Sequence, residues 1–163
     1  MCGICGIFNL DPDGPRPDAG LLRSMVGSLD HRGPDERGGY ISARVALGHA
    51  RLSIIDLAGG AQPMTNEDRS CWLAFNGEIF NYLELGQELR GLGHRLRTNS
   101  DSEVILHAYE QWGTACVERF NGQFAFAIWD GERRQLVLAR DRVGIRPLYY
   151  ARVGRRLLFA SEI

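Results

Sequence analysis

The segment QFAFAIWD (123–130) is apolar on both of its faces, and it restricts the possible folds more than any other stretch of the chain. Alternate side chains of a strand point to opposite sides, so one face carries Phe124, Phe126 and Ile128, and the other carries two alanines and Trp129. A strand that is buried on both faces lies between two layers of structure. The sequence therefore predicts a sheet that is covered on both sides.

Short turns join this segment to the strand-like segments after it, which is typical of antiparallel hairpins. The expected strands cover 3–10, two stretches within 40–55, 71–76, 94–98, 123–130, 135–141, 145–153 and 156–161. Amphipathic helices are expected over 18–29, 82–93 and 100–113, the last opening on a capping box of Ser100 and Glu103. The remaining segments are expected loops, and Asn76-Gly77 is expected to be a turn. Two packed antiparallel sheets with helices outside satisfy this pattern, so the fold class is α+β.

Length and charge narrow the class of protein. The 163 residues suffice for one domain, and 19 basic and 20 acidic side chains give a formal net charge of -1, which indicates no nucleic acid and no anionic membrane as a partner. No apolar run approaches the ~20 residues of a membrane span, and residues 1–10 lack a signal-peptide pattern. We therefore expect a cytoplasmic protein with reduced thiols. The strand-like ending LLFASEI (157–163) predicts a domain of a longer polypeptide.

The chain begins MCGICGI, and the spacing of Cys2 and Cys5 is that of a redox dithiol or half a zinc site. If 3–10 is a strand, the two Cα atoms lie ~10 Å apart and the side chains point to opposite faces. A disulfide needs Cα atoms within roughly 7 Å. A zinc site needs about four ligands, and the chain has no second C-x-x-C and no histidine spacing typical of metal ligands. The sequence therefore predicts no metal site, and Cys5 is interpreted as a small core residue.

Cys2 suggests a different chemistry, because removal of Met1 would leave it with both a thiol and a free α-amine. The pKa of an α-amine is ~7.7–8.0, so a useful fraction is unprotonated near neutral pH. A nucleophile beside its own base needs no histidine partner and suits the hydrolysis of an amide. At this point an incidental terminal cysteine is an equal alternative.

Several polar residues would serve such a thiol, although each also has a structural explanation. Asn76 and the backbone N–H of Gly77 would stabilise an oxyanion, or the pair is an ordinary turn. Arg51 matches a carboxylate, or it lies on the polar face of a strand. Glu78 and Asp101 would each hold an ammonium, or Asp101 only favours a helix N-terminus. Together these residues suit an amino acid zwitterion, and one that bears an amide is glutamine or asparagine.

Motifs spread over nearly the whole chain resemble those of the class II glutamine amidotransferases. They are MCGI (1–4), HRGPD (31–35), GHARLSIIDL (48–57), FNGEIFNY (75–82), SDSEVI (100–105), GQFAFAIWD (122–130) and ARDRVGIRPLYY (139–150). HRGPD and RLSIID look closest to the asparagine synthetase branch. The resemblance implies that residues 1–163 form one glutamine amidotransferase domain. It also implies the fold of an N-terminal-nucleophile hydrolase, a four-layer αββα sandwich.

The resemblance also implies roles for single residues. Cys2 would attack the side-chain amide of glutamine and form a γ-glutamyl thioester, from which water releases glutamate. Asn76 and the N–H of Gly77 would form the oxyanion hole. The other implied contacts with glutamine are Arg51 for the α-carboxylate, Leu52, Ser53, Ile54 and Ile55 for the pocket wall, and Glu78 and Asp101 for the α-amino group.

In the family that the chain resembles, ammonia passes to a second domain that amidates aspartate with ATP and Mg²⁺. The S-G-G-x-D-S loop of that domain is absent from these 163 residues. We therefore expect no cofactor in this domain, and a C-terminal synthetase domain in the same polypeptide as a partner beside L-glutamine. A homodimer is an open alternative to a monomer. A sugar or peptide as the ammonia acceptor, a redox or metal module and a glutamine sensor are open alternatives for the function.

Overall fold

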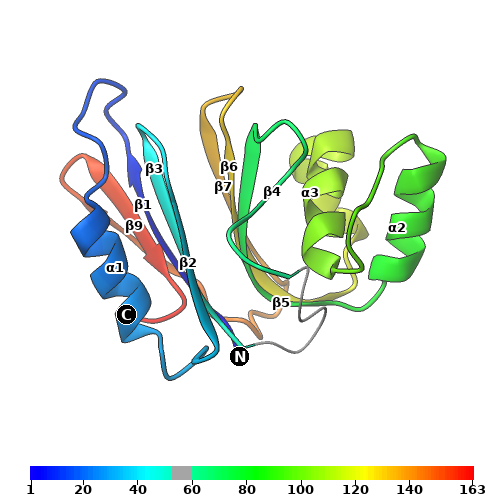
Figure 1. Ribbon diagram of the computed structural model, residues 1–163, viewed down its shortest axis with the longest axis horizontal. Helices are drawn as coiled ribbons and strands as arrows, with labels where there is room; N and C mark the ends of the chain where they lie inside the picture. Colours follow the sequence, from blue (N-terminus) through cyan, green and yellow to red (C-terminus); the bar gives the residue numbers. More distant parts are fainter. Residues whose placement is uncertain (53–59) are drawn as a thin grey trace.

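Two antiparallel sheets lie face to face in the computed structural model, which describes residues 1–52 and 60–163. Helix α1 (Ala19–Ser28) covers the outer face of one sheet, and α3 (Asp101–Trp112) and α2 (Tyr82–Gly91) lie beyond the other (Figure 1). This layer order confirms the predicted αββα sandwich. Within the described residues, no helix is long and apolar enough to cross a membrane.

The first sheet has five strands in the described part of the chain: β1 (Gly3–Asn9), β2 (Glu36–Ile41), β3 (Val45–Arg51), β8 (Tyr149–Val153) and β9 (Arg156–Ala160). They lie in the order β2-β3-β1-β9-β8. β1 is the central strand, and it pairs antiparallel with β3 on one edge and with β9 on the other. The first strand of the chain is therefore held on both sides.

The second sheet has four strands among the described residues: β4 (Met64–Thr65), β5 (Cys71–Ile79), β6 (Gly122–Asp130) and β7 (Gln135–Arg140). Their order is β4-β5-β6-β7, and all neighbours are antiparallel. The two apolar faces predicted for β6 are confirmed. Its phenylalanines and Ile128 belong to the core beneath α2 and α3, whereas its alanines and Trp129 lie in the core between the sheets.

Small side chains allow the two sheets to approach each other. Ala74 of β5 and two alanines of β6 meet Ile4 of β1 and Leu47 of β3 in the inter-sheet core. The aromatic side chains of β5 and β6 that point the other way fill the space beneath the helices, where Phe75 and Phe126 are buried. Each face of the second sheet is thus matched in side-chain size to the layer that covers it.

Local hydrogen bonds set the ends of α1 and α3. At α1, the Asp18 carboxylate accepts a hydrogen bond from the backbone N–H of Leu21 (2.6 Å). At α3, the Ser100 hydroxyl accepts from a backbone N–H two residues further on (3.2 Å). Gly113 ends α3 with φ at 59°, where a glycine is favoured. A 3₁₀ helix, η1, follows over Gly113–Arg119.

The strand expected over 94–98 is wrong, because these residues form no strand. The carboxylate of Glu103 accepts hydrogen bonds from the backbone N–H groups of Arg97 (2.8 Å) and Thr98 (2.6 Å), which are the donors that a strand would need. The same contacts leave the predicted capping box unclosed. The backbone N–H of Ser100 donates instead to the Thr98 hydroxyl (3.2 Å).

The turn expected at Asn76-Gly77 is also wrong, because β5 runs through both residues without interruption. β8 starts later than expected, since the Asp141 carboxylate accepts hydrogen bonds from the N–H groups of Ile145 (2.8 Å) and Arg146 (2.9 Å). These bonds fold residues 141–146 into a turn, so the strand can begin only after them. β2 begins four residues before the strand expected from residue 40, and β4 lies wholly within an expected loop.

Candidate active site

A pocket is lined by residues at the N-terminus of the chain. The N-terminus lies at the end of the sandwich where the two sheets come together (Figure 1). Its volume is about 100 Å³. The described residues that line it are Met1, Cys2, Arg51, Leu52, Gly60, Gln62, Phe75, Asn76, Gly77, Glu78, Ser100, Asp101, Ser102 and Arg146. Every described residue that was predicted to act on or bind glutamine is among them. Ser53, Ile54 and Ile55 lie outside the described residues.

Cys2 stands immediately before the central strand β1. Its thiol contacts the backbone of Leu52 just beyond β3: the Leu52 N–H donates to Sγ (3.4 Å), and Sγ lies 3.6 Å from the Leu52 carbonyl oxygen. The Arg32 guanidinium donates to the carbonyl of Cys2 (3.1 Å) and pairs with Glu162 (2.7 Å). These contacts fix the thiol at the pocket wall.

Cys5 has a different environment, as the strand geometry predicts. Its side chain is fully buried and packs against α1 in a cluster that includes Leu22 and Val26. Burial raises the pKa of its thiol to about 12, so the thiol stays protonated at neutral pH. All four cysteines are free thiols, and burial likewise raises the pKa of Cys71 to about 12 and of Cys116 to about 11. The dithiol interpretation of the N-terminal motif is therefore wrong.

Asn76 and Gly77 lie side by side on β5, facing the pocket. A Cβ atom on Gly77 would stand 2.2 Å from the carbonyl oxygen of Gln123 on β6, and the φ of Gly77 is 155°, so a glycine is required for the close approach of the two strands. Asn76 is 2% exposed as a residue, and its Nδ2 has no hydrogen-bond partner among the described residues. Such an unsatisfied buried donor costs ~1–3 kcal/mol. The pocket therefore contains a donor that is available to a ligand.

Two side chains that the sequence did not point to hold the backbone next to Asn76. The N–H of Phe75 donates to Oε1 of Gln62 (2.7 Å), and Nε2 of His49 lies 2.9 Å from the carbonyl oxygen of Phe75. Gln62 also donates to the Ser102 hydroxyl (3.2 Å). His49 is on β3, so its bond crosses from one sheet to the other. No sequence signal reveals these contacts, because both partners on Phe75 are backbone atoms.

His49 should make stability depend on pH. Burial lowers the pKa of His49 to about 4, whereas an unfolded histidine titrates near ~6.5. The unfolded chain therefore takes up the proton first, so this contribution to stability is complete above pH ~6.5 and is lost towards pH ~4, by about 3 kcal/mol in all. His49→Gln keeps an N–H donor for Phe75 and does not titrate. Urea unfolding at several pH values should give a steeper fall for the wild type than for the variant, and equal slopes would contradict the expectation.

Arg51 ends β3 with its side chain buried, so the alternative of a surface arginine is wrong. Its Nη1 lies 3.0 Å from Oε2 of Glu36, the residue opposite it in the β2–β3 pairing. A guanidinium carries five N–H donors in a planar fork. The ion pair with Glu36 therefore orients the guanidinium and is compatible with a second anion in the pocket.

Two carboxylates form the acidic part of the pocket wall. Asp101 is the first residue of α3, is buried, and accepts a hydrogen bond from the N–H of Ile79 through Oδ2 (3.1 Å). Burial raises the pKa of its carboxyl group above the ordinary value, and the negative charge of Glu78 adds to the effect. Two such carboxylates favour a cation between them. The pocket thus combines a thiol, an amide donor, a guanidinium and an acidic pair.

Comparison with known proteins places the chain in a family. A family model described as a glutamine amidotransferase domain matches residues 1–163. Asparagine synthetase [glutamine-hydrolyzing] 1 of Bacillus subtilis is 42% identical over 163 residues, which are 99% of this chain and 26% of that protein. Asparagine synthetase B [glutamine-hydrolyzing] of Escherichia coli is 41% identical over 169 residues, covering 100% of this chain and 29% of that protein. The chain thus spans about a quarter of the length of these curated relatives.

The fold also has a counterpart among solved structures. Glutamine phosphoribosylpyrophosphate amidotransferase from B. subtilis superposes with a TM-score of 0.78 at 24% sequence identity, over 98% of this chain and 42% of that one. This match confirms the predicted fold of an N-terminal-nucleophile hydrolase. Because the family model matches the chain from end to end, the chain belongs to the family of class II glutamine amidotransferase domains.

Proposed function

We propose that this chain hydrolyses the side-chain amide of L-glutamine to glutamate and ammonia, with Cys2 as the nucleophile after removal of Met1. The observation that carries the proposal is the buried Nδ2 of Asn76, which has no partner among the described residues and lines the same pocket as Cys2. A carbonyl oxygen of a substrate would supply that partner, and an oxyanion would supply a stronger one.

The mechanism needs no group beyond these residues and water. The free α-amine of Cys2 takes the thiol proton, and the thiolate attacks the amide carbon of glutamine. Asn76 Nδ2–H and the N–H of Gly77 donate to the oxyanion that forms. The α-ammonium then protonates the leaving nitrogen, ammonia departs, and a thioester remains. Water, deprotonated by the same amine, attacks the thioester and releases glutamate and the thiol.

The remaining polar residues account for recognition of an amino acid. The guanidinium of Arg51 suits the α-carboxylate, because a planar fork matches two carboxylate oxygens. Glu78 and Asp101 suit the α-ammonium, whose positive charge would relieve the unfavourable burial of the Asp101 carboxylate. Leu52 lies beside the thiol and contributes backbone to the wall.

We further propose that the released ammonia serves the synthesis of asparagine from aspartate in a synthetase domain of the same polypeptide, which would use ATP and Mg²⁺. The names of the B. subtilis and E. coli relatives and their greater length support this acceptor. An ammonia acceptor other than aspartate is the second candidate, because the chain is also similar to a protein that is named as an amidase and not as an asparagine synthetase. The amidase chry2 of Gibberella zeae is 40% identical over 178 residues, covering 100% of this chain and 26% of that protein.

Two assays test the two parts of the proposal, the hydrolysis of glutamine and the use of the ammonia. The chain should release glutamate and ammonia from L-glutamine in equal amounts, and L-asparagine, which is one methylene shorter, should react at least ~10-fold more slowly. The full-length protein should form asparagine from aspartate, ATP and glutamine, and ammonium should replace glutamine. Absence of glutamate release would overturn the hydrolysis. Glutamate release without asparagine formation would overturn only the acceptor.

A further inference from the structure

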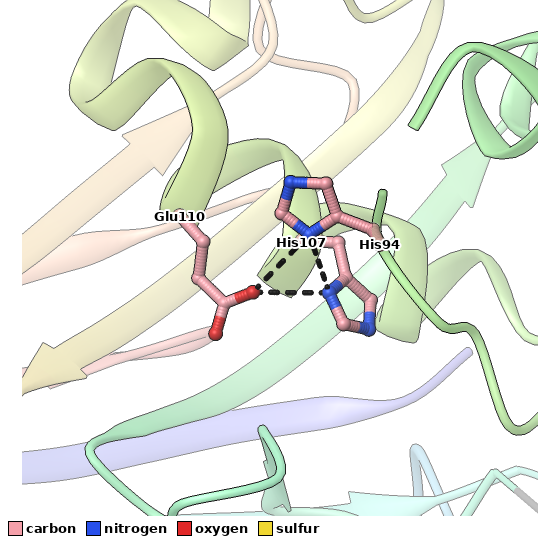
Figure 2. Close-up of side chains that lie close together, drawn as sticks. All are labelled: His94, His107 and Glu110. Atoms are coloured by element: carbon pink, nitrogen blue, oxygen red, sulfur yellow. Dashed lines mark hydrogen bonds and ion pairs between the residues drawn. The ribbon is translucent and has the colours of Figure 1, made fainter. Parts of the chain in front are cut away.

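Two imidazole rings and a carboxylate converge on one point outside the candidate active site (Figure 2). His107 and Glu110 project from α3 one turn apart, and His94 comes from the segment between α2 and α3. None of the three lines the pocket that contains Cys2. The two histidines are 13 positions apart in the sequence, which matches no common ligand spacing, so the cluster could not be predicted from sequence.

The three facing atoms have the separations of metal ligands. Nδ1 of His94 and Nδ1 of His107 are 3.1 Å apart, Nδ1 of His107 is 3.0 Å from Oε2 of Glu110, and Nδ1 of His94 is 3.6 Å from the same oxygen. Two ligands of a tetrahedral ion with bonds of ~2.05 Å stand ~3.3 Å apart. The triangle has a circumradius of ~1.9 Å, so an ion at ~2.0–2.1 Å from all three atoms would lie less than ~1 Å outside their plane.

Hydrogen bonds on the far sides of His94 and Glu110 orient one ligand atom of each residue towards the centre of the cluster. Nε2 of His94 lies 3.0 Å from Oε1 of Gln111, an oxygen that can only accept, so Nε2 carries the proton and Nδ1 presents its lone pair. Oε1 of Glu110 accepts from Asn66 Nδ2 (2.7 Å), which leaves Oε2 for the centre. Outer partners of this kind are typical of metal-ligating histidines and carboxylates.

The surroundings of His107 are negatively charged. Its Nε2 lies 3.5 Å from a carboxylate oxygen of Glu67 and 3.8 Å from one of Glu103, so a proton on Nε2 would leave the Nδ1 lone pair for the centre. Nitrogen and oxygen lone pairs that meet in such a site need a cation between them, either a proton or a metal ion.

We propose that His94, His107 and Glu110 bind one Zn²⁺ ion, with water as the fourth ligand. Two imidazoles and one carboxylate suit zinc, whereas Ca²⁺ and Mg²⁺ prefer oxygen ligands. The His107 side chain is 3% exposed, His94 16% and Glu110 26%, so the ion would enter from the Glu110 side, where water can complete the site. The ion would join α3 to the segment that leads into Ser100 and Asp101 at the pocket wall, which is a structural rather than a catalytic role.

Calorimetric titration of chelator-treated protein with ZnCl₂ tests the site. All variants should carry Cys2→Ala, because the partly exposed thiol of Cys2 could bind zinc by itself. The parent should bind one Zn²⁺, and His94→Ala should bind it at least ~100-fold more weakly, since even outer partners of a ligand contribute ~10–100-fold. The matched control is His31→Ala, which removes a histidine whose side chain is 60% exposed and lies outside the cluster. This control should bind zinc like the parent.

Two further measurements separate loss of the ligand from loss of the fold. Zn²⁺ should raise the melting temperature of the parent and of His31→Ala but leave that of His94→Ala unchanged. Co²⁺ bound to the parent should show the intense visible absorption of a four-coordinate ion. Equal zinc affinity in the parent and His94→Ala, or no binding by the parent, would overturn the proposal. Because these readouts do not involve glutamine, they stand or fall independently of the proposed hydrolysis.

Discussion

Cys2→Ala is expected to abolish glutamate release from L-glutamine, with a loss of at least ~10⁴-fold, while Cys5→Ala keeps most of the activity. Cys2 lines the pocket together with Asn76 and Arg51. Cys5 is buried on the opposite face of β1, and its pKa of about 12 keeps the thiol protonated. The measurement is the initial rate of glutamate formation for both variants and the wild type. The proposal would fail if Cys2→Ala hydrolysed glutamine at a rate near that of the wild type.

The processing state of the N-terminus provides the control for this experiment. In the chain that retains Met1, the nitrogen of Cys2 is part of a peptide bond and cannot act as a base, and Met1 itself lines the pocket, where its sulfur contacts the guanidinium of Arg146. The form that begins at Cys2 should be active, and a form with an uncleaved N-terminal extension should not. Intact mass identifies the two forms, and equal activity in both would contradict a role for the amine.

Asn76→Ala is expected to lower kcat by ~10²–10³, the typical loss for one oxyanion donor, with a smaller effect on KM. The amide nitrogen has no partner among the described residues in the resting pocket, so the free energy of unfolding should change by no more than about 1 kcal/mol. Asn76→Asp is the matched control, because it keeps the size of the side chain but places an acceptor where the donor stood. It should be at least as inactive as Asn76→Ala.

Kinetics and urea unfolding together decide the interpretation of Asn76. A loss of activity below ~10-fold would contradict an oxyanion donor, since such donors contribute more. A large loss of stability with a proportional loss of active protein would instead indicate a structural role for the side chain in β5.

The alternation of apolar side chains predicts the layers of the fold correctly. Local sequence preference gives the wrong secondary structure where a contact with a distant residue decides the backbone conformation. The two apolar faces of β6 required two covering layers, and both are present. Asn76-Gly77 has the composition of a hairpin turn, yet Gly77 is needed because the backbone of β6 at Gln123 leaves no room for a Cβ atom. Residues 94–98 alternate like a strand, but the Glu103 carboxylate binds the N–H groups at Arg97 and Thr98.

The chemistry of the site could be predicted better than its supports. Residue type and family resemblance predict Cys2, Arg51 and Asp101 as site residues, and the fold brings them to one pocket. The supports Gln62 and His49 could not be found in this way, because each binds a backbone atom of Phe75, which any residue could provide. Residue type alone likewise reveals nothing about His94, whose partners on α3 become neighbours only in the folded chain.

The position of β1 in the middle of its sheet has a consequence for a reaction at the end of a chain. Chain termini usually fray, and a frayed terminus would sample many orientations. Here β3 pairs with β1 from Gly3 onwards and β9 pairs with it from Cys5 onwards, so local opening near Cys2 would disturb the sheet interior. Little rotational freedom is left to lose when the thiol meets its substrate. The residue that follows Met1 is therefore attached directly to the central strand of a sheet rather than to a loose end.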